Sequence, residues 1–248
     1  MKTISTIISN YEDLDRLIRL CKRTGYACVD FETNGEKIYN EDFKPTILSV
    51  TCIPGFGFSI PLEHSETKEY TNRNWNWKKA LNKFGKKVIE NPDIVKIAWN
   101  AKFDFQIFEL YHIYSRGTIL DGMLAKYVLN EERPNGLKDM VRRYLPWASN
   151  YEEDKGFNKI PWDKKPLEPL CQYGCQDTDY TFRLTLFFEK IIIDKGLYNL
   201  YRNMIMSASR VLQIVERNGL YLDKKLNNQL LEDYEEKIDK ARDLLFNL

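Results

Sequence analysis

Two carboxylates stand at the end of an apolar, β-branched segment, Tyr26–Thr33, whose sequence is Tyr-Ala-Cys-Val-Asp-Phe-Glu-Thr. Because side chains of a strand alternate between its two faces, Asp30 and Glu32 are expected to share one face. Like charges side by side repel each other, and a divalent cation bound between them relieves the repulsion. Mg²⁺ prefers oxygen ligands of this kind. The pair therefore favours a metal site, although a solvated acidic turn would have the same local sequence.

Two later segments add acidic groups and a phenol. Asp104 follows the strand-like run Asp93–Trp99 and falls in the first turn of the next predicted helix, where an acid is also a common partner of the helix dipole. Tyr173 and Asp177 are four residues apart in a predicted long helix, so they lie on one helix face. Four carboxylates from three separate elements, with a tyrosine, are the groups that two-metal hydrolysis of a phosphodiester requires.

Composition restricts the chemistry further. With 248 residues, 43% of them hydrophobic, the chain can bury a full core. It has only two histidines, which disfavours a zinc site and removes most pairs of nucleophile and base. Five cysteines, an odd number, indicate reduced core thiols rather than a disulfide framework. Aspartate and glutamate side chains are therefore the remaining candidates for catalytic groups.

The charge distribution and the hydropathy set limits on partners and location. A net charge of +1 argues against binding of long duplex DNA by bulk electrostatics alone. Eight basic residues between Asn72 and Lys102 stand against only two acids there. They form either the solvated side of an amphipathic helix or a patch that faces phosphates, and the apolar stripe of the same helix favours the first. The chain has a polar amino terminus and no apolar run long enough to span a membrane. We therefore expect no membrane partner and a cytoplasmic protein, in the host cytoplasm if it comes from a phage.

Strand-like and helix-like segments alternate along the chain. Predicted strands, besides the acidic one, are Thr46–Ile53, Gly55–Leu62, Asp93–Trp99 and Thr118–Leu120. Predicted helices are Tyr11–Arg23, Trp77–Glu90, Gly122–Asn130, Leu137–Tyr144, Leu170–Lys195 and Leu197–Arg217, with a last helix capped by Asp223. Residues Pro146–Pro169 read as a loop. This order predicts an α/β fold with a mixed β-sheet flanked by helices and a C-terminal helical appendage.

Three motifs carry a family resemblance: Val29-Asp30-Phe31-Glu32-Thr33, Asn100-Ala-Lys-Phe-Asp104 and Tyr173-Gly-Cys-Gln-Asp177. Their order and spacing resemble those of the DEDD 3′-5′ exonucleases, and in particular the proofreading domain of family A, polymerase I-like, DNA polymerases. The similarity covers about Tyr26 to Leu186. Gln172 stands where one subclass has a histidine, so Tyr173 places the chain with the tyrosine-type (DEDDy) enzymes. The resemblance implies a ribonuclease H-like fold.

The resemblance also implies an activity and its residues. The chain would be a hydrolase that removes nucleotides from the 3′ ends of single-stranded or frayed DNA, using two divalent ions, Mg²⁺ or substituting Mn²⁺. One ion would be held by Asp30, Glu32 and Asp177, and the second by Asp30 with Asp104. Tyr173 would orient the attacking water, because a phenol with an ordinary pKa of about 10 is a poor base at neutral pH. Thr33, Asn100 and Phe103 would bind the terminal nucleotide.

One position departs from the family pattern. Relatives usually place an apolar wedge shortly after the residue that matches Thr33, whereas this chain has Asn34-Gly35-Glu36. Stacking of a base on an aromatic ring contributes about 1–3 kcal/mol to binding. Phe103, Phe105 and Phe157 are candidates to replace the wedge.

The segment from Leu197 onward, especially Val211–Asp223, resembles the helices that open the polymerase region of the same family. We therefore divide the chain into an exonuclease domain, 1–196, and a helical segment, 197–248, and expect a polymerase domain or subunit as a partner. Two alternatives stay open. One is an exoribonuclease similar to RNase D, which shares the acids and the tyrosine; the other is a catalytically inactive exonuclease fold that binds nucleic acid.

Overall fold

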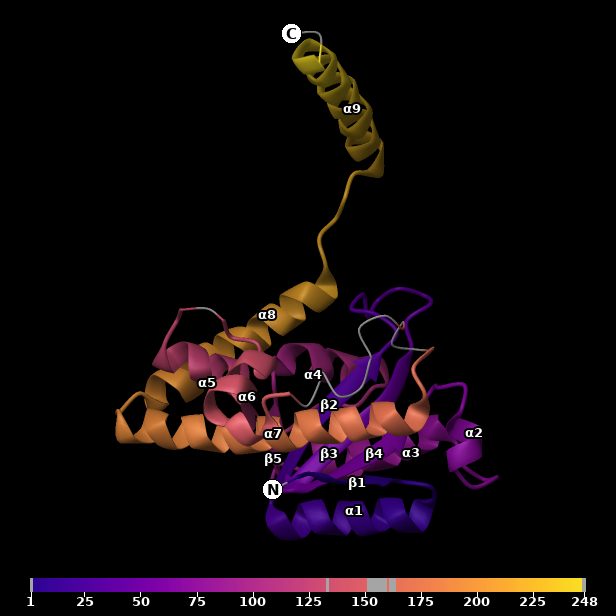
Figure 1. The fold of residues 1–248 in the computed structure, drawn as a ribbon, viewed down its shortest axis with the longest axis vertical. Coiled ribbons are helices and arrows are strands. Elements are labelled where there is room, and N and C mark those ends of the chain that lie inside the picture. The colour runs from indigo at the N-terminus through magenta and orange to yellow at the C-terminus, as the bar shows by residue number, and fades with distance from the viewer. Residues whose placement is uncertain (1, 133, 151–159, 161–163, 247–248) are drawn as a thin grey trace. The chain divides into compact units, whose positions relative to one another are not determined.

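The computed structural model describes residues 2–132, 134–150, 160 and 164–246. The chain divides into two compact units, Met1–Gln213 and Ile214–Leu248. The first unit contains a β-sheet with helices packed on both of its faces (Figure 1). Among the helices described, none combines the length and the apolar character needed to cross a membrane.

The sheet of the first unit is mixed, as predicted. Its six described strands have the order β1-β4-β3-β2-β5-β6. They are β1 (Ile4–Ile7), β2 (Tyr26–Thr33), β3 (Pro45–Ile53), β4 (Phe56–Pro61), β5 (Val95–Ala98) and β6 (Ile119–Asp121). The pairs β2–β3 and β3–β4 are antiparallel, and β1–β4, β2–β5 and β5–β6 are parallel. Strand β1 was not predicted, because it is short and largely exposed at the sheet edge and so has no apolar alternation.

Apart from α2, which was not predicted, the helices follow the predicted order, with shifted boundaries. They are α1 (Tyr11–Thr24), α2 (Thr67–Tyr70), α3 (Trp77–Phe84), α4 (Ala101–Leu110), α5 (Gly122–Leu129), α6 (Leu137–Tyr144), α7 (Leu167–Asp194), α8 (Met206–Asn218) and α9 (Lys224–Phe246). Two π-helical segments, η1 (Gly85–Ile89) and η6 (Leu200–Ile205), and one 3-10 turn, η2 (Pro146–Ala148), complete the described helical structure. Helix α7 begins before the predicted Leu170, because Pro169 falls in its first turn, where the missing N–H has no intrahelical partner anyway.

Alternation along β2 directs the two acids of this strand toward α7. Val29 and Phe31 belong to the core cluster that includes α1, α3 and α4. Cys28 belongs to the opposite cluster, formed with α5, α6 and α7. Asp30 and Glu32 lie two and four residues after Cys28 in the strand, so they share its face. This is the side of the sheet that α7 covers (Figure 1).

Helix α7 approaches the sheet closely at a glycine beside the candidate catalytic tyrosine. A Cβ atom added at Gly174 would lie 2.3 Å from Oγ of Ser49 on β3. Only a residue without a side chain allows α7 to pack at this distance. Gly174 therefore sets the position of its neighbours on α7, Tyr173 and Asp177, relative to β2.

We expect Gly174→Ala to lower the free energy of unfolding by about 1–3 kcal/mol, because overpacking forces a backbone shift. The shift would also move Tyr173 and reduce activity. Gly35→Ala is the matched control, since a Cβ at Gly35 meets nothing within 4 Å. Urea denaturation of both variants measures the difference. Equal stability of the two variants would contradict the role assigned to Gly174.

The predicted cysteine state and the predicted solvated basic face are both observed. All five cysteines are buried and reduced. On α3 and η1 the apolar residues Leu81, Phe84 and Val88 are fully buried. The lysines of the opposite side are exposed: Lys78, Lys79, Lys86 and Lys87. Lys96 differs from the other basic residues of this stretch, because it is buried and its pKa is lowered to about 8 by desolvation.

Residues after Gly196 contribute to the core of the first unit. The Tyr201 ring is fully buried in the cluster formed with α5 and α7. Its hydroxyl accepts a hydrogen bond from the Asp121 amide at 2.8 Å and donates one to the Asp121 carbonyl at 3.0 Å. In the second unit, the Asp223 carboxylate accepts hydrogen bonds from the backbone amides of Lys225 and Leu226, so it caps α9 as predicted.

Candidate active site

Three carboxylates from two elements converge on the face of the sheet that α7 covers. Asp30 and Glu32 come from β2, and Asp177 comes from α7. Each offers one oxygen, and the three oxygens lie within 4.8 Å of one another. In the described part of the chain this is the single group of three or more potential ligands that meets this distance criterion. The oxygen donors and their spacing fit a hard divalent cation.

Asp104 lies beside these three carboxylates and is tied to the strand that carries two of them. Its Oδ1 accepts a hydrogen bond of 2.9 Å from the Phe31 amide, which lies between Asp30 and Glu32 in the chain. Asp104 is 2% exposed. The four predicted acids are therefore assembled from β2, α4 and α7. Tyr173, 4% exposed, lies one helical turn before Asp177.

Burial dominates the electrostatics of this acidic cluster. It raises the pKa of Asp30 well above the ordinary value, and the charges of Glu32, Asp104 and Asp177 raise this pKa further. Burial likewise raises the pKa of Glu32, and the charge of Asp177 adds to the shift. The pKa of Asp104 is raised by burial, against the lowering effect of its hydrogen bond from Phe31. The cluster therefore has an unfavourable charge that a bound cation would offset.

Two lysines that the sequence patterns did not single out lie near the acids. The Nζ atom of Lys138, on α6, lies over the Tyr173 ring at 5.8 Å from its centroid. The positive charge of Lys138 lowers the pKa of both Asp30 and Glu32, and Lys165 lowers that of Glu32. Lysines on an amphipathic helix and in a polar segment have no sequence signal that separates them from solvated charges.

Asp121 positions the start of α4 and was missed as a functional residue. Its carboxylate accepts hydrogen bonds from the amides of Asn100 at 3.2 Å and Ala101 at 2.8 Å. It also caps α5 by accepting from the amides of Met123 and Leu124. An acid directly before a helical run is an N-cap signal, but its bonds to a segment twenty residues earlier have no local signature.

Thr33 and Asn100, both predicted to bind substrate, flank the cluster at the ends of two strands. The Thr33 hydroxyl donates a hydrogen bond of 2.7 Å to the Gly35 carbonyl, just after an irregularity in the β2–β3 pairing. Asn100 is exposed and has a left-handed backbone with φ 61°. Asparagine tolerates this conformation better than most residues, and here it redirects the chain from β5 into α4.

The three phenylalanines proposed to replace the missing wedge differ in accessibility. Phe103 is partly buried against the core and retains some exposed surface. Phe105 is 2% exposed and packs against Phe108, so its proposed stacking role is wrong: the side chain faces the core. Phe157 lies outside the described residues.

The raised carboxyl pKa values predict how metal-free stability depends on pH. A carboxyl whose pKa is higher in the folded state than in the unfolded chain stabilises the fold below about pH 4. That contribution is lost as the pH rises through the folded pKa, which for Asp104 is about 8. At high pH the ionised acids repel one another, and a bound cation offsets this repulsion. Added Mg²⁺ should therefore raise the melting temperature more at pH 8 than at pH 5.

Differential scanning calorimetry with Mg²⁺ or with EDTA measures this effect, and about 100 Kd of ligand would add roughly 2.7 kcal/mol. Asp139→Asn removes an acid that is 39% exposed on α6, and should leave the response unchanged. A Mg²⁺ response that is equal at both pH values would contradict the prediction.

A mixed sheet flanked by helices, with a carboxylate cluster where β2 meets α7, defines a ribonuclease H-like nuclease fold. The family model described as 3′-5′ exonuclease matches residues 5–193. The chain belongs to this family, the 3′-5′ exonuclease domains of family A DNA polymerases.

Similar proteins include polymerases and a ribonuclease. The chain is 28% identical over 243 residues to DNA polymerase I of Borreliella burgdorferi, covering 95% of this chain and 26% of that protein. The chain thus spans about a quarter of the length of that curated relative. In fold it is similar to the structure titled as the POL domain of Pol1 from M. smegmatis (TM-score 0.67, 18% identity, 96% of this chain and 36% of that one). It is also similar to Escherichia coli RNase D (TM-score 0.62, 16% identity, 88% and 52%).

Proposed function

We propose that the chain is a metal-dependent 3′-5′ exodeoxyribonuclease of the proofreading type, which shortens single-stranded or frayed DNA from its 3′ end. The observation that carries this proposal is the convergence of Asp30, Glu32 and Asp177, with Asp104 hydrogen-bonded to the strand between the first two. Acids held this close together are electrostatically unfavourable without a cation, and they are the ligands that two-metal phosphodiester hydrolysis uses.

The residues present fit two divalent cations, Mg²⁺ or substituting Mn²⁺. Asp30, Glu32 and Asp177 would hold one ion, and Asp30 with Asp104 would hold the second. When bound, such ions supply positive charge where negative charge develops on the reacting phosphate. Carboxylate oxygens are ligands that suit hard cations such as Mg²⁺ and Mn²⁺.

The proposed reaction is hydrolysis of the terminal phosphodiester. The oxygen of a water molecule attacks the phosphorus, the bond from phosphorus to the 3′ oxygen breaks, and a proton passes to that leaving oxygen. The products are a 5′-mononucleotide and a strand one nucleotide shorter with a 3′-hydroxyl. Tyr173 would orient the attacking water, while Thr33, Asn100 and Phe103 would hold the terminal nucleotide.

DNA rather than RNA is favoured because the curated relatives are DNA polymerases. A polymerase domain or subunit is the corresponding partner, and residues 197–248 are then a helical segment that leads toward it, in a cytoplasmic setting. An RNase D-like exoribonuclease is the second candidate, supported by the similar fold of RNase D.

The test uses a 5′-labelled single-stranded DNA oligonucleotide and an RNA of the same sequence, incubated with the full chain and Mg²⁺, Mn²⁺ or EDTA. We expect a ladder shortened from the 3′ end, faster on DNA, and no cleavage in EDTA. Faster cleavage of RNA would favour the exoribonuclease. No cleavage of either strand by protein that unfolds cooperatively would favour an inactive fold that only binds nucleic acid.

A further inference from the structure

A small cavity lies between α4, η6 and the first turns of α8, apart from the acidic cluster. Its volume is about 160 Å³. The residues described along its wall extend no further than Gln213, so they all belong to the first unit. In this region α8 lies beside α4 (Figure 1), because the side-chain amide of Gln213 donates a hydrogen bond of 3.0 Å to the Glu109 carboxylate. The cavity is therefore enclosed by elements of one folded unit.

The wall of this cavity is positively charged. Its described residues include no acid, and they include three cationic side chains, which are Lys102 of α4, Arg202 of η6 and Arg210 of α8. Ser207 and Ser209 add two hydroxyl groups to the same wall. Glu189 of α7 lies near Arg202, since burial raises its pKa and the charge of Arg202 lowers it, but Glu189 does not line the cavity. A ligand that enters therefore meets cations and hydroxyl groups.

The two arginines of the wall are held to different degrees. The Arg202 guanidinium donates hydrogen bonds to the Ile119 carbonyl at 2.5 Å and to the Thr118 hydroxyl at 3.3 Å. These bonds use two of its five N–H donors and fix its position. Arg210 is exposed, and its two hydrogen bonds to Ser115 are both 3.4 Å long, beyond the usual range. Arg202 is thus a fixed part of the wall, whereas Arg210 can turn toward a ligand.

The size and the charge of the cavity define the kind of anion that fits it. Pockets for drug-sized ligands measure about 300–1,000 Å³, so this cavity suits a smaller group. One guanidinium fork satisfies a carboxylate, whereas two guanidinium groups and an ammonium group match an anion with several oxygens and more than one charge. A phosphate group has both properties at neutral pH.

The surface beside Arg210 argues against a bound nucleic-acid strand. A strand is held by a groove of positive charge that follows its backbone. The residues that follow Arg210 are Val211 and Leu212, which are apolar and 59% and 53% exposed. The positive charge is therefore confined to the cavity, as a single phosphate group requires.

We propose that this cavity is a binding site for the phosphate group of a small molecule, either free phosphate or a nucleoside monophosphate. Arg202 and Lys102 bind the phosphate from the wall, and Arg210 turns onto it from α8. The bound phosphate bridges α4 and α8 and so stabilises their contact. The site goes beyond the proposed function and does not depend on it.

The test is calorimetric titration of the full chain with inorganic phosphate in EDTA, at constant ionic strength. Without a cation the acidic cluster repels anions, so the titration reports on the cavity. Arg210→Met removes the charge at an exposed position, and Arg210→Lys keeps it without the planar fork. We expect phosphate affinity to fall about 10-fold or more in Arg210→Met and to recover partly in Arg210→Lys.

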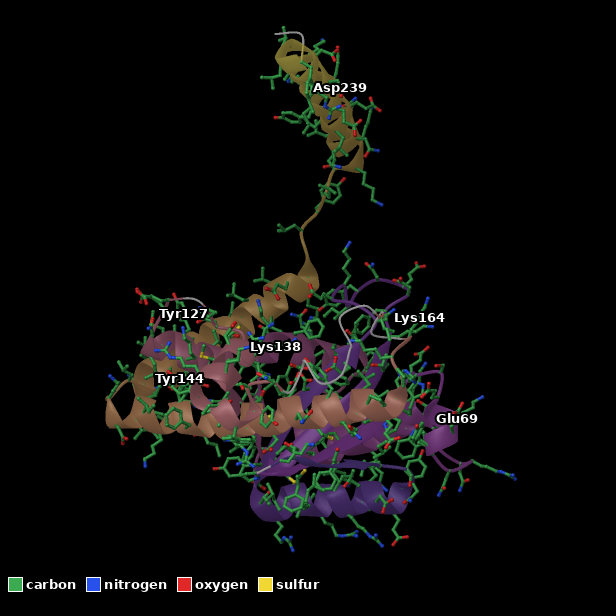
Figure 2. The ribbon with its side chains drawn as sticks, in the orientation of Figure 1. Glu69, Tyr127, Lys138, Tyr144, Lys164 and Asp239 are labelled. Carbon is green, nitrogen blue, oxygen red and sulfur yellow. The ribbon has the colours of Figure 1, made fainter. Side chains whose placement is uncertain are left out.

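Arg143→Met is the matched control, because it makes the same chemical change at an exposed arginine outside the cavity. Cζ of Arg143 lies 5.6 Å from the centroid of the Tyr144 ring, which Figure 2 labels and which packs on Phe187 and Phe188 of α7. Its phosphate affinity should stay within about twofold of the wild type. Absence of phosphate binding by the wild type, or equal binding by wild type and Arg210→Met, would overturn the inference.

Two further ligands identify the source of the phosphate. Tighter binding of deoxyadenosine 5′-monophosphate than of inorganic phosphate, with the same dependence on Arg210, would identify a nucleotide, and equal or weaker binding would identify the free ion. Fluorescence anisotropy with a labelled oligonucleotide lacking a terminal phosphate, also in EDTA, tests the strand. If Arg210→Met weakens oligonucleotide binding more than phosphate binding, the site holds backbone phosphates and the proposed ligand is wrong. None of these measurements requires cleavage, so their failure leaves the proposed function untouched.

Discussion

Asp30→Asn is expected to abolish 3′-shortening of DNA, with a loss of about 10³-fold or more in kcat. Asp30 is the acid that both proposed ion positions share, and a neutral amide neither balances the cations nor replaces a carboxylate ligand. Loss of several kcal/mol of charge stabilisation in the transition state corresponds to a rate change of this size. Gel analysis of a 5′-labelled oligonucleotide under single-turnover conditions measures it.

The same substitution should stabilise the metal-free protein at neutral pH. Burial and three neighbouring acids raise the pKa of Asp30, so its ionised form is unfavourable in the apo fold. A variant that is inactive yet at least as stable as the wild type in EDTA would separate catalysis from folding. Asp139→Asn, at an acid on α6 whose side chain is 39% exposed, should leave both properties unchanged. Retention of more than a tenth of the wild-type rate by Asp30→Asn would refute the metal assignment.

Asp121→Ala is expected to lower the free energy of unfolding by about 2–4 kcal/mol and kcat by about tenfold or more. Asp121 is 1% exposed and accepts hydrogen bonds from four backbone amides at the starts of α4 and α5. Alanine removes that acceptor from all four amides, of which the Ala101 amide is buried. The start of α4 would then shift, and Asp104 with it.

Asp223→Ala is the control for this prediction. Asp223 caps the exposed helix α9, and its substitution should lower the free energy of unfolding by only about 0.5–2 kcal/mol. Urea denaturation and steady-state kinetics on both variants give the comparison. If Asp121→Ala is no more destabilising than Asp223→Ala, or if it is destabilised with kcat unchanged, then Asp121 does not hold the active-site helix in place.

Local periodicity explains the parts of the fold that were predictable. The strand at Tyr26–Thr33 was predicted with its observed bounds, because a segment of eight residues that contains four β-branched or aromatic ones follows Gly25 and ends at a polar turn. The period of two places Asp30 and Glu32 on one face, and the helical period places Tyr173 and Asp177 on one face. The predicted start of α7 at Leu170 is wrong, because Pro169 was taken as the end of a loop although it lies in the first turn of the helix.

The sequence by itself determined which residues could supply metal ligands, because residue type and period are local properties. The tertiary structure decided which of them meet. The approach of α7 to β3 at Gly174, the bond from Phe31 to Asp104 and the position of Lys138 over Tyr173 all join segments distant in the chain. Such contacts depend on how helices pack on the sheet, and packing leaves no periodic mark in the sequence.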